Sequence, residues 1–120
     1  MRWRTVCKLA GRLPEVLHAN SYGTPVLAVR GSLMARLSDD RRSVLVKAED
    51  AQRLALCASK PATFSPGGPI WNGTTVAVRL ATVEPQDLQD VLLSAWRRSA
   101  PPSLVASIEP AALHWGDAPG

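Results

Sequence analysis

The stretch that decides the fold is Ser21-Tyr22-Gly23-Thr24-Pro25, followed by residues 26–37, which read VLAVRGSLMARL. Gly23 can adopt the positive φ that a tight corner requires, whereas Pro25 fixes its own φ near −65° and favours an extended Thr24. An apolar run then leads to Arg30-Gly31, and a second apolar run follows this turn. The pattern predicts a rigid corner that leads into an antiparallel hairpin.

The segments around this hairpin predict more of the same sheet and a helix before it. Apolar residues at helical spacing predict an amphipathic helix over residues 3–13, which Pro14 ends. Asp and Ser in the segment 38–42 suit a turn, because their side chains bond to the nearby backbone. The strands predicted in this half of the chain are residues 16–20, 25–29, 32–37 and 43–47.

The second half of the chain repeats the alternation of helix and strand. A helix is predicted over residues 49–58, with an apolar face made of Ala51, Leu54, Ala55 and Ala58. The stretch Ser65-Pro66-Gly67-Gly68-Pro69 predicts a loop, and no lysine follows it as a P-loop would require. Asn72-Gly73 predicts a hairpin turn before a strand over residues 74–80. The last predicted helix begins at Pro85 and has Trp96 on its buried stripe.

This order of elements defines the expected fold class. Helix, antiparallel strands, helix, strands and helix predict an α+β two-layer sandwich, a mostly antiparallel sheet with helices on one face. A length of 120 residues and a hydrophobic content of 46% suit a single globular domain. We expect residues 107–120, which are rich in Pro and Ala, to form a partly mobile tail.

Composition narrows the class of function. No segment matches a signal peptide or a membrane span, so a cytoplasmic protein without membrane contact is expected. Cys7 and Cys57 are isolated, and His18 and His114 lack a second ligand at metal spacing, so we expect no metal and no cofactor. No GxSxG motif or assembled triad is present, so an enzyme is not expected.

Charge is unevenly distributed along the chain. Residues 1–47 hold nine basic and three acidic groups, a balance of +6, whereas residues 48–120 hold five basic and seven acidic groups, a balance of −2. Segregation of this kind is typical of a face directed at a polyanion. The observation indicates nucleic acid as a candidate partner.

The chain resembles the MmcQ/YjbR-like family of small bacterial proteins over residues 1–106. The resemblance rests on Ser21–Pro25, the Gly31 turn, Val78-Arg79-Leu80, and the last helix from Asp87 through Arg97, with Leu104-Val105-Ala106 beyond it. It implies a CyaY-like (frataxin-like) fold and a double-wing mode of DNA binding through two hairpins. Family members usually have Trp in the strand before the Val-x-Val-Arg segment, where this chain has Thr75. The basic first helix does not offer the oxygen ligands that iron handling would need.

The candidate site combines basic and aromatic residues, and we expect double-stranded DNA to be held mainly through its phosphates. The basic candidates are Arg30, Arg36, Arg41, Arg42 and Lys47, because guanidinium groups grip phosphate bidentately. The aromatic candidates are Tyr22 and Trp71, which could stack on bases; the structural alternatives are a buried Tyr22 ring bonded to the backbone and a Trp71 that covers the end of the sheet. The alternative function is a protein-interaction or small-ligand module without nucleic acid. A monomer or weak dimer is expected.

Overall fold

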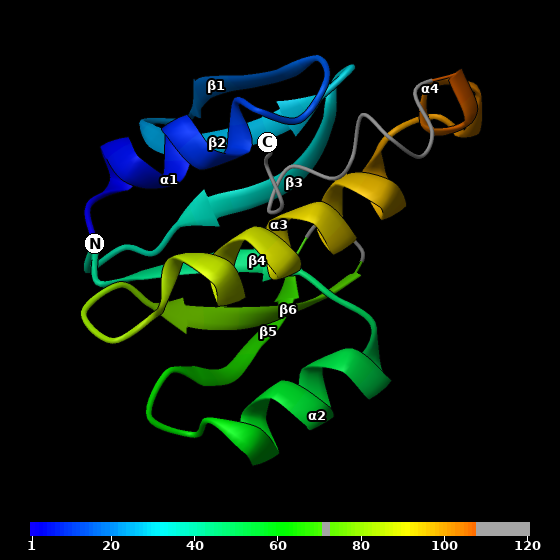
Figure 1. Ribbon diagram of the computed structural model, residues 1–120. Helices are drawn as coiled ribbons and strands as arrows, with labels where there is room; N and C mark the ends of the chain where they lie inside the picture. The colour runs from blue at the N-terminus through cyan, green and yellow to red at the C-terminus, as the bar shows by residue number, and fades with distance from the viewer. Residues whose placement is uncertain (71–72, 108–120) are drawn as a thin grey trace.

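The computed structural model describes residues 1–70 and 73–107, and shows an α+β fold built on one six-stranded antiparallel sheet (Figure 1). The strand order is β1-β2-β3-β4-β6-β5. The elements in chain order are α1 (Trp3–Ala10), β1 (Val16–Ser21), β2 (Thr24–Val29), β3 (Ser32–Leu37), β4 (Ser43–Lys47), α2 (Asp50–Ser59), β5 (Phe64–Ile70), β6 (Gly73–Arg79), α3 (Pro85–Ser99) and α4 (Pro102–Ser107). The predicted fold class is confirmed.

The helices form one layer over the sheet. α3 packs on β2, β3 and β4, α1 packs against α3, and α2 lies against β5 and β6 (Figure 1). Apolar side chains from the facing side of the strands, among them Leu27, Val44 and Val76, belong to one core with the helices. Trp96 of α3 is fully buried in that core, and its indole nitrogen donates a hydrogen bond to the Pro14 carbonyl at 2.9 Å.

Two tight turns join the first three strands, and the register between β2 and β3 shifts once, between Leu27 and Ala28. Arg30-Gly31 joins β2 to β3, as predicted, and the φ values of +46° and +81° are those of a type I′ turn. Tyr22-Gly23, with φ values of +52° and +83°, joins β1 to β2 in the same way. The predicted corner is therefore itself a hairpin turn. Thr24 and Pro25 belong to β2, where they pair with Ser21 and Asn20.

The prediction of a loop over Ser65–Pro69 is wrong, because these residues lie in β5. β5 pairs with β6 and carries an irregularity between Pro66 and Gly68. An edge strand tolerates proline, because half of its backbone amides face away from the partner strand and need no hydrogen bond within the sheet. Glycine is common at a β-bulge such as this one. Gly67 is required sterically: a Cβ at this position would lie 2.2 Å from Thr75 Oγ1. A hairpin between β5 and β6 is present, but Gly73, which the sequence predicts in its turn, is the first residue of β6 and pairs with Ile70. Residue 72 lies outside the described part of the chain.

The face predicted for helix α2 is also wrong. Ala51, Ala55 and Ala58 are exposed and the Leu54 side chain is 65% exposed, whereas Leu56 and Cys57 are half-buried against the core. Ion pairs at both ends tie α2 to α3 in an antiparallel arrangement. Glu49 pairs with Arg98 at 2.8 Å, and Lys60 pairs with Asp87 at 2.5 Å. These anchors, together with the buried residues on either side of the helix, oppose the rotation that its apolar periodicity indicates.

Helix α1 is shorter than predicted. It ends at Ala10, and Gly11 caps it by donating to the Cys7 carbonyl at 2.9 Å. Arg12 and Leu13 continue as a tighter turn, in which Leu13 is buried. The predicted tail lies outside the described residues except for Ser107, the last residue of α4.

Candidate nucleic-acid interface

The antiparallel sheet separates the candidate residues into two groups, one at each end of the strands. At one end lie the Tyr22-Gly23 turn, the segment 38–42 that joins β3 to β4, and Arg79 at the end of β6, whose partner in the register is Ser43. We call this the basic end of the sheet. At the opposite end lie Arg30-Gly31 and Lys47.

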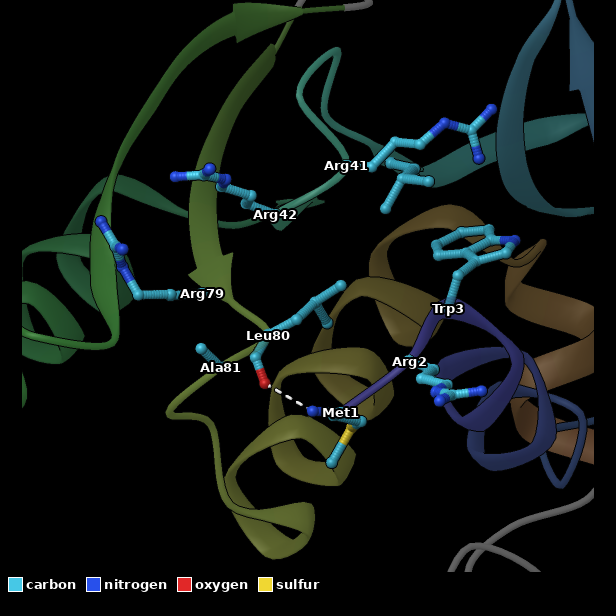
Figure 2. Close-up of a pocket in the computed structure, with 9 residues that line it drawn as sticks. Met1, Arg2, Trp3, Arg41, Arg42, Arg79, Leu80 and Ala81 are labelled. Atoms are coloured by element: carbon cyan, nitrogen blue, oxygen red, sulfur yellow. Dashed lines mark hydrogen bonds between the residues drawn. The ribbon is translucent and has the colours of Figure 1, made fainter.

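A cavity of about 560 Å³ opens at the basic end. Its lining comes from the start of α1, the β3–β4 connection and the end of β6, segments that are far apart in sequence. The lining residues are Met1, Arg2, Trp3, Leu37, Arg41, Arg42, Arg79, Leu80 and Ala81 (Figure 2). The Met1 nitrogen donates a hydrogen bond to the Leu80 carbonyl at 2.8 Å, which holds the start of the chain beside β6.

Four arginines surround this cavity: Arg2, Arg41, Arg42 and Arg79, all exposed. We call them the arginine cluster. Figure 2 shows Arg42 and Arg79 on one side of Leu80 and Arg41 on the other, with Arg2 beside Trp3. The side chains of Arg42 and Arg79 extend to one side and that of Arg41 to the other, so the guanidinium groups do not converge on one point. This arrangement suits an extended anion better than a single small one.

Within residues 1–70 and 73–107 the arginine cluster forms no ion pair, because no carboxylate there lies within 4.0 Å of its guanidinium groups. The Asp40 carboxylate interacts with Arg42 through its charge only at longer range. The ion pairs of the structure involve other cations: Arg30, Arg36, Arg53, Lys60 and Arg98. An unpaired guanidinium at a surface keeps all five of its N–H donors available for a phosphate.

Two acidic residues in the β3–β4 connection are engaged locally. Asp40 accepts hydrogen bonds from Ser38 Oγ at 2.6 Å and from the Arg42 backbone N–H at 3.0 Å. These bonds, the one from Ser38 foremost, hold the pKa of the Asp40 carboxyl below its usual value. Asp39 lies 3.7 Å from Arg36. The carboxylates therefore shape the turn that presents Arg41 and Arg42.

Only part of the predicted site lies together. Arg41, Arg42 and Tyr22 are at the basic end, and Arg36 lies on the face of the sheet opposite the core, in register with Val26 and Leu45. Lys47 lies toward the other end. Trp71 falls outside the described residues.

Arg30 is committed to a partner. Its Nε and Nη2 donate to the two carboxylate oxygens of Glu15 at 2.8 and 2.9 Å. This pair lowers the pKa of the Glu15 carboxyl, chiefly through the hydrogen bonds from Arg30. Because the fork of Arg30 is occupied, this residue is a weaker phosphate ligand than the arginine cluster.

Arg2 and Arg79 are functional candidates that the sequence pattern did not single out. The sequence pattern places Arg79 on the polar face of a predicted strand, and Arg2 in a basic amino-terminal segment, and neither position indicates a binding site. The signal that connects them with Arg41 and Arg42 is the pairing of β4 with β6, which places Arg79 opposite Ser43. Pairing between strands this distant in sequence is not encoded in local periodicity.

Tyr22 is exposed, so the buried structural role favoured by its neighbours in sequence is wrong. Its side chain has full solvent exposure and its φ is positive. A bulky residue in the left-handed region is uncommon, and the first position of a type I′ turn ordinarily holds Asn, Asp or Gly. The turn thus presents an aromatic ring to solvent at the basic end.

The remaining chemistry of the described residues is limited. They contain no group of three or more His, Cys, Asp or Glu side chains placed to hold a metal ion. None of their helices has the length and apolar character needed to span a membrane. Comparison with family models, with curated proteins and with solved structures found no match to this chain. The functional proposal therefore rests on the site itself.

Proposed function

We propose that this protein binds double-stranded DNA through its phosphate backbone, and that the basic end of the sheet forms the contact. The observation that carries the proposal is the arginine cluster, four exposed guanidinium groups around one cavity with no carboxylate partner among the described residues. A surface that leaves this many like charges unpaired is stabilised when a polyanion binds to it.

The divergence of the guanidinium groups supports an extended ligand. Arg42 and Arg79 extend to one side of Leu80 and Arg41 to the other (Figure 2), so a single phosphate cannot contact all of them at once. Duplex DNA presents phosphates in a regular row, at about one negative charge per 1.7 Å of helix axis. Successive phosphates along a backbone can therefore occupy separate members of the cluster.

The proposal includes membership of the MmcQ/YjbR-like family, with one change from what the resemblance implies. The contact shifts from the Arg30-Gly31 hairpin to the opposite end of the sheet, because Arg30 is already held by Glu15. We further propose a cytoplasmic protein that is a monomer or a weak dimer. The two free cysteines, Cys7 and Cys57, suit a reducing compartment.

The test measures how salt affects the affinity for a duplex of random sequence, by fluorescence anisotropy. Four phosphate contacts predict a slope of log K against log salt of about −3.6, from roughly −0.9 per contact. In the double variant Arg41→Ala, Arg42→Ala, the affinity should fall equally for all sequences and the slope should flatten by about two units, one per lost contact.

A matched control removes the same net charge elsewhere. The double variant Arg30→Ala, Arg97→Ala changes one arginine at the opposite end of the sheet and one on α3. It should retain most of the affinity and the parental slope. Absence of binding at low salt would overturn the proposal, and equal losses in the two double variants would reduce it to a general effect of net charge.

A further inference from the structure

A second cavity, of about 400 Å³, lies next to the Tyr22-Gly23 turn and is not part of the arginine cluster. It is lined by Ser21, Tyr22, Thr24, Val26, Leu33 and Arg36. Its lining combines apolar walls, three hydroxyl groups and one guanidinium group, and its volume falls in the range of about 300–1,000 Å³ that small-molecule sites occupy. Such a cavity can hold a flat ring that carries hydrogen-bond acceptors.

Arg36 supplies unused donors to this cavity. Its side chain is 25% exposed, and its Nε is buried without a hydrogen-bond partner in the described structure. Its one ion pair is long, 3.7 Å from Nη2 to an Asp39 carboxylate that is itself 91% exposed. The Nη groups of Arg36 make no hydrogen bond with the described residues, so they are the donors that a ligand with acceptor atoms in this cavity can use.

Tyr22 supplies a stacking surface at the same cavity. The ring is fully exposed and is held on a rigid turn at a positive φ of 52°. A left-handed backbone is disfavoured for an ordinary residue, and Asn or Gly would fit this turn better. Strain at an exposed aromatic residue beside a cavity is typical of a binding position.

The cavity lies near the basic end of the sheet, and Thr24 also lines a neighbouring cavity there. A smaller cavity of about 90 Å³ lies between the two turns and is lined by residues of both, among them Gly23 and Arg41. A strand whose phosphate contacts Arg41 therefore passes close to the Tyr22 turn. The base of that nucleotide can enter the cavity only if it is unpaired, because both faces of a paired base are stacked within the duplex.

We propose that the cavity at Tyr22 and Arg36 binds one unpaired nucleobase of a DNA strand held by the arginine cluster. The Tyr22 ring stacks on the base, and Arg36 donates hydrogen bonds to acceptors at its edge, such as guanine O6 and N7. The inference rests on the proposed function, since the arginine cluster holds the backbone. It adds a preference for ends, gaps or overhangs over intact duplex.

The experiment compares three duplexes of the same sequence by fluorescence anisotropy: a blunt duplex, one with short guanine overhangs at its 5′ and 3′ ends, and one whose overhangs have the same phosphates but abasic sugars. The guanine overhangs should bind at least about fivefold more tightly than the abasic ones, the lower end of what base stacking on an aromatic side chain contributes. The blunt duplex reports on the arginine cluster alone.

Variants assign the effect to the cavity. Tyr22→Asn suits the type I′ turn and should fold at least as well as the parent, yet it should abolish the preference for guanine over abasic overhangs, whereas Tyr22→Phe should keep it. Arg36→Gln should reduce the same ratio. The matched controls are Leu54→Ala, an exposed side chain on α2, and Arg53→Gln, whose guanidinium is also buried at Nε and paired within its own helix.

The outcomes separate this inference from the proposed function. No binding of any duplex overturns the proposed function and the inference with it. Blunt binding with equal affinities for guanine and abasic overhangs overturns the inference alone, as does a preference that survives in both Tyr22→Asn and Arg36→Gln. Competition by free guanosine monophosphate at concentrations comparable to the overhang would assign the cavity to a free nucleotide and overturn the strand-bound form.

Discussion

Replacing Trp96 tests how the helical layer is joined to the sheet. The side chain is fully buried at the centre of the core, and its indole nitrogen bonds to the Pro14 carbonyl, 82 residues away in sequence. Trp96 therefore fills a large volume and also fixes the turn between α1 and β1. The two roles can be separated by two substitutions, Trp96→Ala and Trp96→Phe.

The magnitudes follow from these two roles. Trp96→Ala loses about 3–5 kcal/mol for the buried ring and the cavity that it leaves, and about 1 kcal/mol more for the hydrogen bond, so we expect a loss of about 4–6 kcal/mol in the free energy of unfolding. Trp96→Phe keeps a ring in the core but removes the donor, and should cost about 1–3 kcal/mol. A domain of ordinary stability, about 5–15 kcal/mol, retains a measurable transition after the second change.

The assay is urea denaturation followed by far-ultraviolet circular dichroism, so that loss of the indole does not affect the signal. Leu54→Ala is the control, because this exposed leucine should change the free energy of unfolding by less than about 0.5 kcal/mol. A cost of less than about 2 kcal/mol for Trp96→Ala would contradict the role of the indole ring in filling the core. That role would also be contradicted if Trp96→Phe costs as much as Trp96→Ala, since the buried volume would then contribute nothing.

Two further predictions concern the edge strand β5 and the pH dependence of stability. Gly67→Ala should destabilise by about 1–3 kcal/mol, because its Cβ meets Thr75 Oγ1 at 2.2 Å; thermal melts should show that Thr75→Ala relieves part of this loss. The pKa of Glu15 is lowered by Arg30, so their interaction stabilises the fold above the ordinary pKa of glutamate and is lost as the pH falls through the lowered value. Melts of Glu15→Gln and the parent should therefore differ at neutral pH and converge in acid, and a difference that persists in acid would contradict this account.

The first half of the fold was predictable because its signals are local. Arg30-Gly31 lies between two apolar runs, and its two-residue turn fixes the first pairs, Val29 with Ser32 and Ala28 with Leu33. The shift of register that follows between Ala28 and Leu27 is not encoded in this local pattern. The corner at Tyr22-Gly23 was only partly interpreted. Gly23 fits the second position of a type I′ turn, but Tyr22 does not fit the first position, where Asn, Asp or Gly is usual. The sequence therefore does not predict a two-residue hairpin turn here.

The failures in the second half have a common physical cause, since tertiary contacts override local pattern there. Two prolines and two glycines read as a loop, yet β5 is an edge strand where missing donors and a bulge are tolerated. In α2, the apolar spacing of Ala51 through Ala58 indicates the wrong face, because ion pairs to α3 hold both ends of the helix.

The sequence predicts which type of residue forms the candidate site, but it does not predict where on the fold these residues come together. An excess of positive charge in residues 1–47 indicates a polyanion, and Arg41-Arg42 are correctly expected in a turn. The separation of Arg30 from Arg41-Arg42 follows already from the predicted strand 32–37, which lies between the two turns. The addition of Arg79 depends on the pairing of β4 with β6, which local sequence patterns do not encode.

The two outer strands of the sheet differ in a way that limits how these molecules can associate. β5 has two prolines and a bulge, whereas β1 has no proline and no charged side chain. Because the Tyr22-Gly23 turn pairs Ser21 with Thr24, alternate residues of β1, including His18, direct their backbone groups away from β2. The edge strand β1 can pair with one further strand, whereas the prolines and the bulge of β5 prevent pairing at the other edge. The sheet can therefore be extended once, by a single added strand or by β1 of a second copy. At high concentration, edge-to-edge association of this protein should therefore stop at a dimer and should not give fibres.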